Sequence, residues 1–510
     1  MTIRNQSIRN EVKVLNMPSV RFGQRSMFAM LCAILLFGFW TETNFAEKVQ
    51  PDRNDCDIWA NFVREKEAHG TLFNWADFIP PLVPDSQNFA LTPIVASSYS
   101  KVLGGKSAEN AGDQLGMVPG EGEEYPSFGD WMNGKAINLR AWQQYYRTLA
   151  LHTNEFPVPA VVGLPAADVL YALSIYTNRI ENLRVASRLP FSRFPLKYDL
   201  GNPSETRLPH LASLNNCVSS LKLRACAELA MGQGESAMAD VELMFRLMDS
   251  IRTEPCLISQ MVRCSMQAKL LQPVWEGVVE HQWSDAQLVR ISSNFEKLNF
   301  LGDYKRVMAA EHCMELLWID RLCATTNFAS FSNRLQTFGM SVDTNDFELF
   351  LQRDRGEWAC GNKLLLARTW ATQWQSMVDD AKQRIYGEQI QAINRIVDQR
   401  TNGEVAAYFL QVDCNSAARF GFSHTITQFA LVAIALERYW LSNKNYPKTL
   451  AELIPDLMNA DKLPREVMTG LPLHYERHSS VRYLLSAKGW KDTVSHRETG
   501  HFFLPMWTWP

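Results

Sequence analysis

Glu311, His312 and Glu315 are the group of side chains in this chain whose types and spacing most readily suggest chemistry. Residues three and four apart share one face of a helix, so a helix over 302–322 would gather the three side chains. Carboxylates and an imidazole in that arrangement could bind a divalent metal or transfer protons. Helical metal sites usually pair two such motifs, and the sequence holds one copy. We therefore expect a partly solvated helix face rather than a metal site.

His474, Glu476 and His478 are a second group with a spacing compatible with metal binding, because alternate residues of a strand point to the same face. Polar residues at alternate positions of a hairpin also commonly face solvent, and no further strong metal ligand lies near these three residues in the sequence. We expect a solvent-facing strand here.

The usual catalytic motifs are missing from the sequence. Leu103-Gly104-Gly105-Lys106-Ser107 is similar to the end of a phosphate-binding loop, but Ser100 stands where the first glycine is needed. No nucleophile elbow, zinc-protease helix or dinucleotide-binding turn is present. A triad assembled from distant segments would leave no such motif. We assign no catalytic, cofactor-binding or metal-binding residue, and no cofactor.

The chain contains 15 tryptophans, which could line a groove for a ligand or peptide. Large aromatic cores are the more common explanation in helical proteins, and we expect that here. The tryptophans considered are Trp131, Trp142, Trp275, Trp283, Trp318 and Trp358.

An apolar run over 27–40 sets the expected location of everything that follows it. Basic residues precede the run and acidic residues follow it, and basic flanks stay on the cytoplasmic side of an inserting segment. We expect a single-pass membrane protein with a cytoplasmic N-terminus and an extracytoplasmic bulk. Because a span needs roughly 17–25 apolar residues and a signal core about 7–15, cleavage to a periplasmic or secreted protein is the alternative.

Composition and charge are typical of a globular protein. The 510 residues are 46% hydrophobic and carry a formal charge of −3, which gives no overall attraction to nucleic acid. The partners expected are the membrane, through residues 27–40 if they are not cleaved, and another protein. None of the cysteines has CxxC spacing. Four of them lie at apolar helical positions and are expected to be mostly buried free thiols: Cys217, Cys226, Cys256 and Cys264.

The fold class expected is mainly α, an antiparallel bundle or array of helical hairpins with a small C-terminal α+β hairpin. Ala225–Arg246 resembles one tetratricopeptide-like hairpin, but no second copy follows. The helices expected in the central part cover 166–188, 208–231, 235–252, 257–280, 284–297 and 302–322. Further helices are expected over 357–396, 404–419 and 424–443, and the last is read as a buried core helix despite its apolar character.

The expected organisation has six parts. They are a basic lead and export segment (1–46), an irregular aromatic-rich region (47–160), a helical domain (161–322), a connector (323–356), further helices (357–420) and an α+β tail (421–510).

The tail resembles the globular end of the major pseudopilins of type II secretion. It contains Asn445-Tyr446-Pro447 followed by Thr449-Leu450-Ala451-Glu452, and then Gly470-Leu471-Pro472-Leu473 before a predicted hairpin around Ser479-Ser480. The prepilin processing signal and the glutamate of the pilin helix are absent from the apolar run. The resemblance therefore implies a similar local fold and no pilin subunit, and we carry over no metal site.

Most of residues 52–486 also resemble uncharacterised exported proteins of Planctomycetes and Verrucomicrobia. The matching stretches include 83–90, 193–198 and 257–263. This resemblance implies export and brings no activity. The function expected first is a non-enzymatic scaffold or protein-binding module outside the cytoplasm. The alternatives are a hydrolase of envelope or extracellular polymer with its site between helices, and an accessory component of a secretion system.

Overall fold

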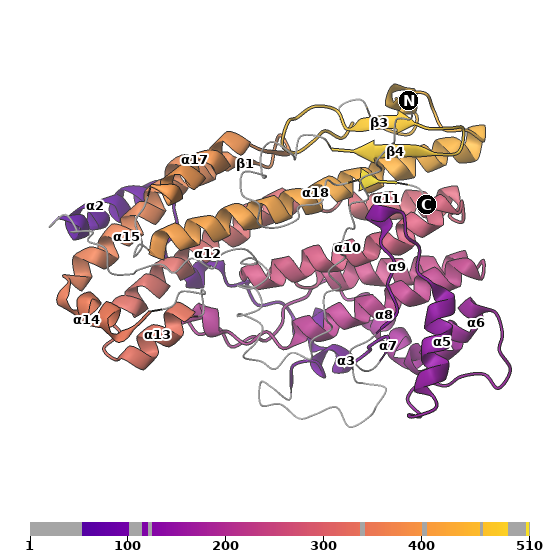
Figure 1. Cartoon of the computed structure of the whole chain (residues 1–510), viewed down its shortest axis with the longest axis horizontal. Helices are drawn as coiled ribbons and strands as arrows, with labels where there is room; N and C mark the ends of the chain where they lie inside the picture. Colours follow the sequence, from indigo (N-terminus) through magenta and orange to yellow (C-terminus); the bar gives the residue numbers. More distant parts are fainter. Residues whose placement is uncertain are drawn as a thin grey trace, which may run out of the picture.

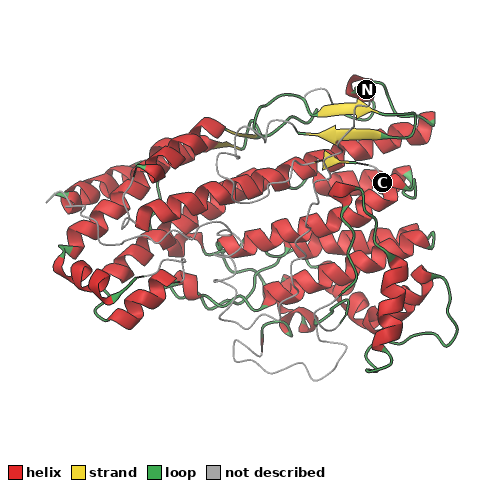
Figure 2. Ribbon diagram, viewed as in Figure 1, coloured by secondary structure: helices red, strands yellow, loops and turns green. Residues whose placement is uncertain are grey.

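The computed structural model describes residues 54–100, 115–120, 125–336, 342–399, 405–459, 463–487 and 506–508, so the apolar run 27–40 and the loop 103–107 lie outside the described residues. The described chain is mainly helical with two small antiparallel sheets, which confirms the expected fold class (Figures 1 and 2). The helices are α2 (Asp55–Ala68), α3 (Pro93–Ala96), α5 (Leu139–Leu149), α6 (Pro165–Leu173), α7 (Thr177–Ser187), α8 (His210–Ala230), α9 (Gly234–Asp249), α10 (Leu257–Val279), α11 (Asp285–Phe295), α12 (Phe300–Cys323), α13 (Phe328–Gln336), α14 (Thr344–Gln352), α15 (Arg355–Thr369), α16 (Gln375–Met377), α17 (Gly387–Asp398) and α18 (Val405–Asn443). The strands are β1 (Val378–Asp379), β2 (Arg384–Ile385), β3 (His474–Arg477), β4 (Tyr483–Ser486) and β5 (Met506–Trp507).

Helices α8, α9, α10 and α18 run along the long axis of the molecule (Figure 1). The turn from α8 to α9 passes through Gly232, whose φ of +70° suits a residue without a side chain. At the start of α11, Ser284 is followed three residues later by Gln287, a sequence pattern typical of a helix start, and the two form a reciprocal capping box. Short connections join α8, α9 and α10, which pack against one another and bury their apolar faces in the main hydrophobic core.

Helix α18 is continuous where the sequence suggests two helices, and the expected boundary at residue 420 falls inside it. Gly421 does not break the helix, and the hydroxyls of Thr425 and Thr427 donate to carbonyls one turn earlier at 2.9 Å. By length and apolar composition α18 could cross a membrane, but 83% of its most apolar stretch is buried inside the molecule. The described chain therefore uses this helix as a core element, packed against α10, α11, α12, α15 and α17.

The predicted helix over 357–396 is interrupted. Helix α15 passes into a π-helical turn over Trp370–Trp374, and the short hairpin β1–β2 separates it from α17. The expected connector before it contains helices α13 and α14, and Asp343 caps α14 by accepting from the backbone N–H of Asp346 at 2.9 Å. A π-helical turn rotates the side chains that follow it, and such turns are frequent at functional sites.

The C-terminal tail forms the three-stranded sheet β3–β4–β5, and the predicted hairpin is present with Tyr475 opposite Leu485. Tyr446 fastens the tail to the helices: its hydroxyl donates to Glu437 of α18 at 2.8 Å. The other oxygen of Glu437 accepts from His281 Nδ1 at 2.8 Å, and the ring of His281 stacks on Trp440 at 3.5 Å. Glu437 is fully buried, so these two donors satisfy a carboxylate that could otherwise not remain in the core.

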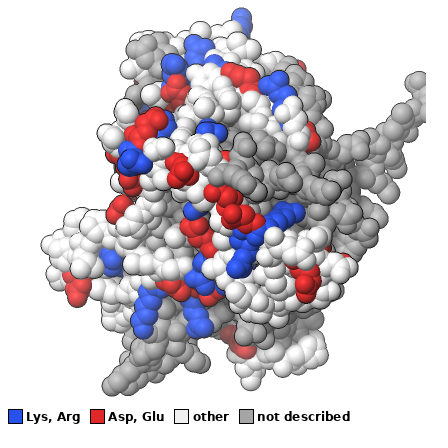
Figure 3. Space-filling model, turned by 90° about the vertical axis from the view of Figure 1, so that its left-hand side faces the viewer, with Lys and Arg blue, Asp and Glu red and all other residues white. Residues whose placement is uncertain are grey.

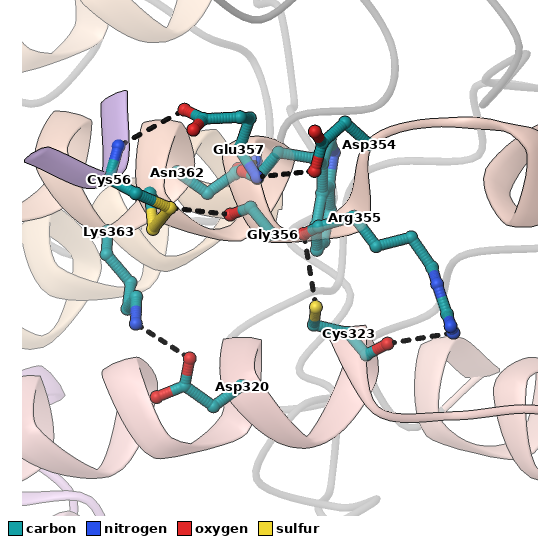
Figure 4. The surroundings of a disulfide bond; sticks show 11 residues. Cys56, Asp320, Cys323, Asp354, Arg355, Gly356, Glu357, Asn362 and Lys363 are labelled. Carbon is teal, nitrogen blue, oxygen red and sulfur yellow. Dashed lines mark hydrogen bonds and ion pairs between the residues drawn. A yellow bond between two sulfur atoms is a disulfide. The ribbon is translucent and has the colours of Figure 1, made fainter. Parts of the chain in front are cut away.

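A disulfide between Cys56 and Cys360 joins α2 to α15 across 304 residues of sequence (Figure 4). Beside it, Lys363 of α15 contacts Asp320 of α12 at 2.7 Å, and the Cys323 thiol donates to the Arg355 carbonyl at 3.1 Å. The other described cysteines are free thiols, and Cys217, Cys226 and Cys264 are buried while Cys256 is partly exposed, so the expectation for this group is largely confirmed.

Candidate functional site

Helices α12 and α18 bring His312, Glu315 and Asp413 together in the interior. One ligand atom from each residue can be chosen so that all three lie within 4.8 Å of one another. The residues are 5%, 1% and 0% exposed, respectively. The expected partly solvated face is therefore wrong for His312 and Glu315: the neighbouring helix α18 covers this part of α12 and supplies the second motif that the sequence search did not find.

The polar atoms of this group have almost no partners within the described structure. Both carboxylate oxygens of Glu315 and both of Asp413 lack a hydrogen bond, and so does His312 Nε2. The His312 Nε2 and Asp413 Oδ2 atoms are 3.4 Å apart without hydrogen-bond geometry. Since a buried polar group without a partner costs roughly 1–3 kcal/mol, five such atoms in one place are a feature to be explained.

Other buried carboxylates of the described chain are paired. Asp303 accepts from Arg263 at 2.9 Å, and Asp168 from Arg147 at 3.0 Å. Asp240 is fully buried and accepts from Arg224 at 2.7 and 2.8 Å. No lysine or arginine lies within 4 Å of Glu315 or Asp413 among the described residues. Within the described core, these three buried acids thus have arginine partners, whereas Glu315 and Asp413 between α12 and α18 have none.

The imidazole of His312 is held by two tryptophans from the π-helical turn. Trp370 stacks on its face at 3.8 Å with the planes 10° apart, and Trp374 meets its edge at 4.6 Å. In a regular helix the two tryptophans would be placed differently, so the π-helical turn fixes how the histidine is enclosed. The ring is left with Nε2 directed toward the carboxylate group.

The backbone around Asp413 is also fixed. Tyr304 and Ser416 both donate to the Asp413 carbonyl, at 3.0 and 2.8 Å. Trp374 Nε1 donates in turn to the Tyr304 hydroxyl at 3.0 Å. The same aromatic turn that encloses His312 therefore also supports the position of Asp413, while the Asp413 side chain itself makes no hydrogen bond.

Burial changes the protonation equilibria of the group. Burial, followed by repulsion from Asp413, raises the pKa of Glu315 well above its usual value. Burial raises the pKa of Glu311 to about 8, although the backbone N–H of Leu257 donates to it. Burial lowers the pKa of His312, which outweighs the opposing effect of Asp413. At neutral pH the imidazole is therefore uncharged.

Glu311 and Glu315 are the two acidic residues that line a partly open pocket with a volume of about 90 Å³. That volume holds several water molecules or a short chemical group. Most of the wall is apolar or aromatic, and it comes from segments far apart in the sequence. The lining residues are Trp75, Pro203, Ser204, Thr206, Leu208, Pro255, Cys256, Leu257, Ile258, Glu311, Met314, Glu315, Trp318, Tyr408, Phe409 and Val412.

The second sequence candidate stays at the surface. His474 and His478 each approach Glu476, at 3.7 and 3.5 Å, and the three side chains are 36%, 52% and 56% exposed in the order His474, His478, Glu476. The solvent-facing interpretation is confirmed for this group. The expected aromatic core is also confirmed, because the six tryptophans considered are at most 7% exposed, although Trp318 additionally lines the pocket.

The described part of the surface in Figure 3 carries acidic and basic side chains interspersed with one another. On the face shown, the mixture does not form the continuous basic patch that is typical of nucleic-acid binding.

Asp413 is the site residue that sequence reasoning missed. The signal for it in the sequence is an acid within the mostly apolar helix that begins at Val405, because an acid is costly to bury unless it has a role.

No family model, no curated protein and no solved structure matches this chain. The suggested resemblances therefore stay predictions.

Proposed function

We propose that this protein is a hydrolase that acts outside the cytoplasm, with its site between α12 and α18. The observation that carries the proposal is the unpartnered group His312, Glu315 and Asp413 next to an apolar pocket. A pocket with convergent polar groups at one end is the usual form of an active site. The hydrolase therefore becomes the leading hypothesis, in place of the non-enzymatic scaffold or protein-binding module that the sequence favours.

The chemistry follows from the positions of these groups. A water molecule or substrate in the pocket would lie beside Glu311 and Glu315, whose raised pKa values favour the protonated form, so these acids can orient it and donate a proton to a leaving group. The apolar wall would hold a short acyl or alkyl group beside the bond to be cleaved. With a pocket of about 90 Å³, a small substituent fits better than an extended polymer segment, although a polymer end could enter.

Turnover of small chromogenic substrates by the purified full chain tests this function. A panel of short-chain esters, amides, phosphate esters and glycosides would cover the main hydrolytic classes. We expect one class to be cleaved, and Glu315→Gln to lower kcat by at least about 100-fold. Met314→Trp should raise KM by filling the pocket. Glu348→Gln, on the exposed face of α14, is the matched control. Background rates for every class would refute the hydrolase.

The location is part of the proposal. The disulfide between Cys56 and Cys360 supports an extracytoplasmic bulk, because disulfides persist mainly in oxidising compartments. Membrane attachment through residues 27–40 rests on the sequence pattern. A phosphatase reporter fused after Pro510 should be active, and a reporter that works only in the cytoplasm would contradict export.

Binding of a protein partner is the second candidate function, and an exposed apolar segment favours it. Val161, Val162 and Leu164 are 81%, 63% and 65% exposed, and Leu151 and Tyr171 nearby are 79% and 50% exposed. Apolar residues exposed close together in the sequence, such as Val161, Val162 and Leu164, can form the contiguous apolar surface that marks an interface. A photo-crosslinker at Val162 should then capture one defined partner in intact cells. Equal capture from a crosslinker at Leu349 on α14 would refute the interface.

A further inference from the structure

The geometry points to a divalent transition-metal ion bound by His312, Glu315 and Asp413. We infer this site from three ligand atoms that converge from two helices, are almost fully buried, and have no other partner in the described structure. The inference deepens the proposed hydrolase by naming its cofactor class, and it rests on that function only for the role of the ion in turnover.

The distances suit a metal after small side-chain adjustments. Ligands bound to one ion at about 2.0–2.2 Å in tetrahedral geometry lie roughly 3.4 Å apart. The present atoms lie within 4.8 Å of one another, and His312 Nε2 and Asp413 Oδ2 already lie 3.4 Å apart. Rotation of the Glu315 side chain, which no hydrogen bond restrains, would complete the set.

The charges are also balanced by a divalent ion. As metal ligands the two carboxylates would be deprotonated and, with a neutral imidazole, would contribute a charge of −2, and no arginine or lysine within the described chain pairs with them. A nitrogen ligand with two oxygens favours Zn²⁺, Co²⁺ or Mn²⁺ over Mg²⁺ and Ca²⁺, which prefer oxygen ligands alone. The ion would thus remove the energetic cost of an otherwise unpaired group.

Three protein ligands leave an open coordination position, as in catalytic rather than structural zinc sites. Glu315 lines the pocket, so the open position would face the space where a substrate enters. Trp370 and Trp374 hold the His312 ring, and Tyr304 and Ser416 hold the Asp413 backbone. These contacts orient the ligands in the way that surrounding residues do in known metal sites.

Metal binding is tested on the chelator-treated full chain, purified without a histidine tag. The exposed pair His474 and His478 could bind Zn²⁺ weakly, so both are first replaced by asparagine in the background variant. Titration with Zn²⁺ and Co²⁺, followed by calorimetry and by Co²⁺ visible absorption, should show one ion per chain. A rise in Tm on metal addition gives an independent readout.

Asp413→Asn and Glu315→Gln should each weaken Zn²⁺ binding at least about tenfold, with Glu348→Gln unchanged. Far-UV circular dichroism of both variants checks that they fold. If Asp413→Asn does not fold, Glu315→Gln still tests the site.

Absence of a bound ion, unchanged affinity in both folded variants, or equally tight Ca²⁺ binding would overturn the site. Tight metal binding without turnover would refute the hydrolase and leave the metal site intact. Turnover that survives metal removal would leave the hydrolase intact and refute the role of the ion in turnover.

Discussion

Glu437 and Glu315 are two acids buried equally deeply in helices of the same core, and their surroundings are opposite. Glu437 accepts one hydrogen bond on each oxygen, from His281 and Tyr446, and thereby joins the tail to α18. Glu315 also has a histidine and a second acid nearby, yet neither of its oxygens is bonded. The first arrangement is complete without any ligand. The second leaves both Glu315 oxygens without a hydrogen bond.

Burial of a charged residue does not by itself indicate function. Glu437 and Asp240 are 0% exposed and Asp303 is 4% exposed, against 1% for Glu315, but their hydrogen-bond partners explain their burial. What distinguishes the group between α12 and α18 is the coincidence of unpartnered atoms, an adjoining pocket and a rigid aromatic support. Each of these features is common, and their combination at one place points to a ligand.

The largest expected effect comes from breaking the complete network. Glu437→Ala removes the acceptor of both His281 and Tyr446 and leaves a cavity, so the free energy of unfolding should fall by about 4 kcal/mol. Urea denaturation followed by fluorescence measures the change. Glu348→Ala on the exposed face of α14 should alter stability by less than about 0.5 kcal/mol. A loss below about 1 kcal/mol for Glu437→Ala would show that the network holds little of the fold.

A buried histidine outside both regions, His424, makes the free energy of unfolding depend on pH. Burial lowers the pKa of His424 to about 4, below its value in the unfolded chain. Protonation then favours the unfolded state, so this contribution to stability is complete above about pH 6.5 and is lost as the pH falls toward 4. The total loss is about 3 kcal/mol. In His424→Leu the decline in unfolding free energy between pH 6.5 and 4.5 should be shallower, and His152→Leu at the surface should leave it unchanged. Identical slopes in all three proteins would contradict this role for His424.

The smallest expected effect has the opposite sign to the first. In metal-free protein, Glu315→Met replaces an unpartnered carboxyl group by an apolar side chain of similar length, so stability should rise by about 1–2 kcal/mol. Denaturation in the presence of a chelator measures it. A destabilisation comparable to that of Glu437→Ala would mean that Glu315 has a structural partner, and the contrast between the two acids would disappear.

Much of this fold can be predicted from the sequence, together with two of the three site residues, His312 and Glu315. Regular apolar periodicity and a capping box place α10 and α11 within a residue or two of their observed ends. The π-helical turn at Trp370–Trp374 could not be foreseen, because no proline, glycine or other local signal marks it and the helical spacing of the two tryptophans also fits a regular helix. Asp413 lies about 100 positions from Glu315, so their proximity depends on how α12 and α18 pack.

The disulfide has a mechanical consequence. It closes residues 56–360 into a covalent ring that contains α12, while α18 follows the ring in the chain. A pulling force applied to the chain before Cys56 would pass through the sulfur bridge to α15 and bypass the helices inside the ring. With 304 residues between the cysteines, roughly 1,000 Å of chain would be withheld from extension until the bridge is reduced. A protein held at a membrane by its N-terminal end would thereby keep His312 and Glu315 free of load.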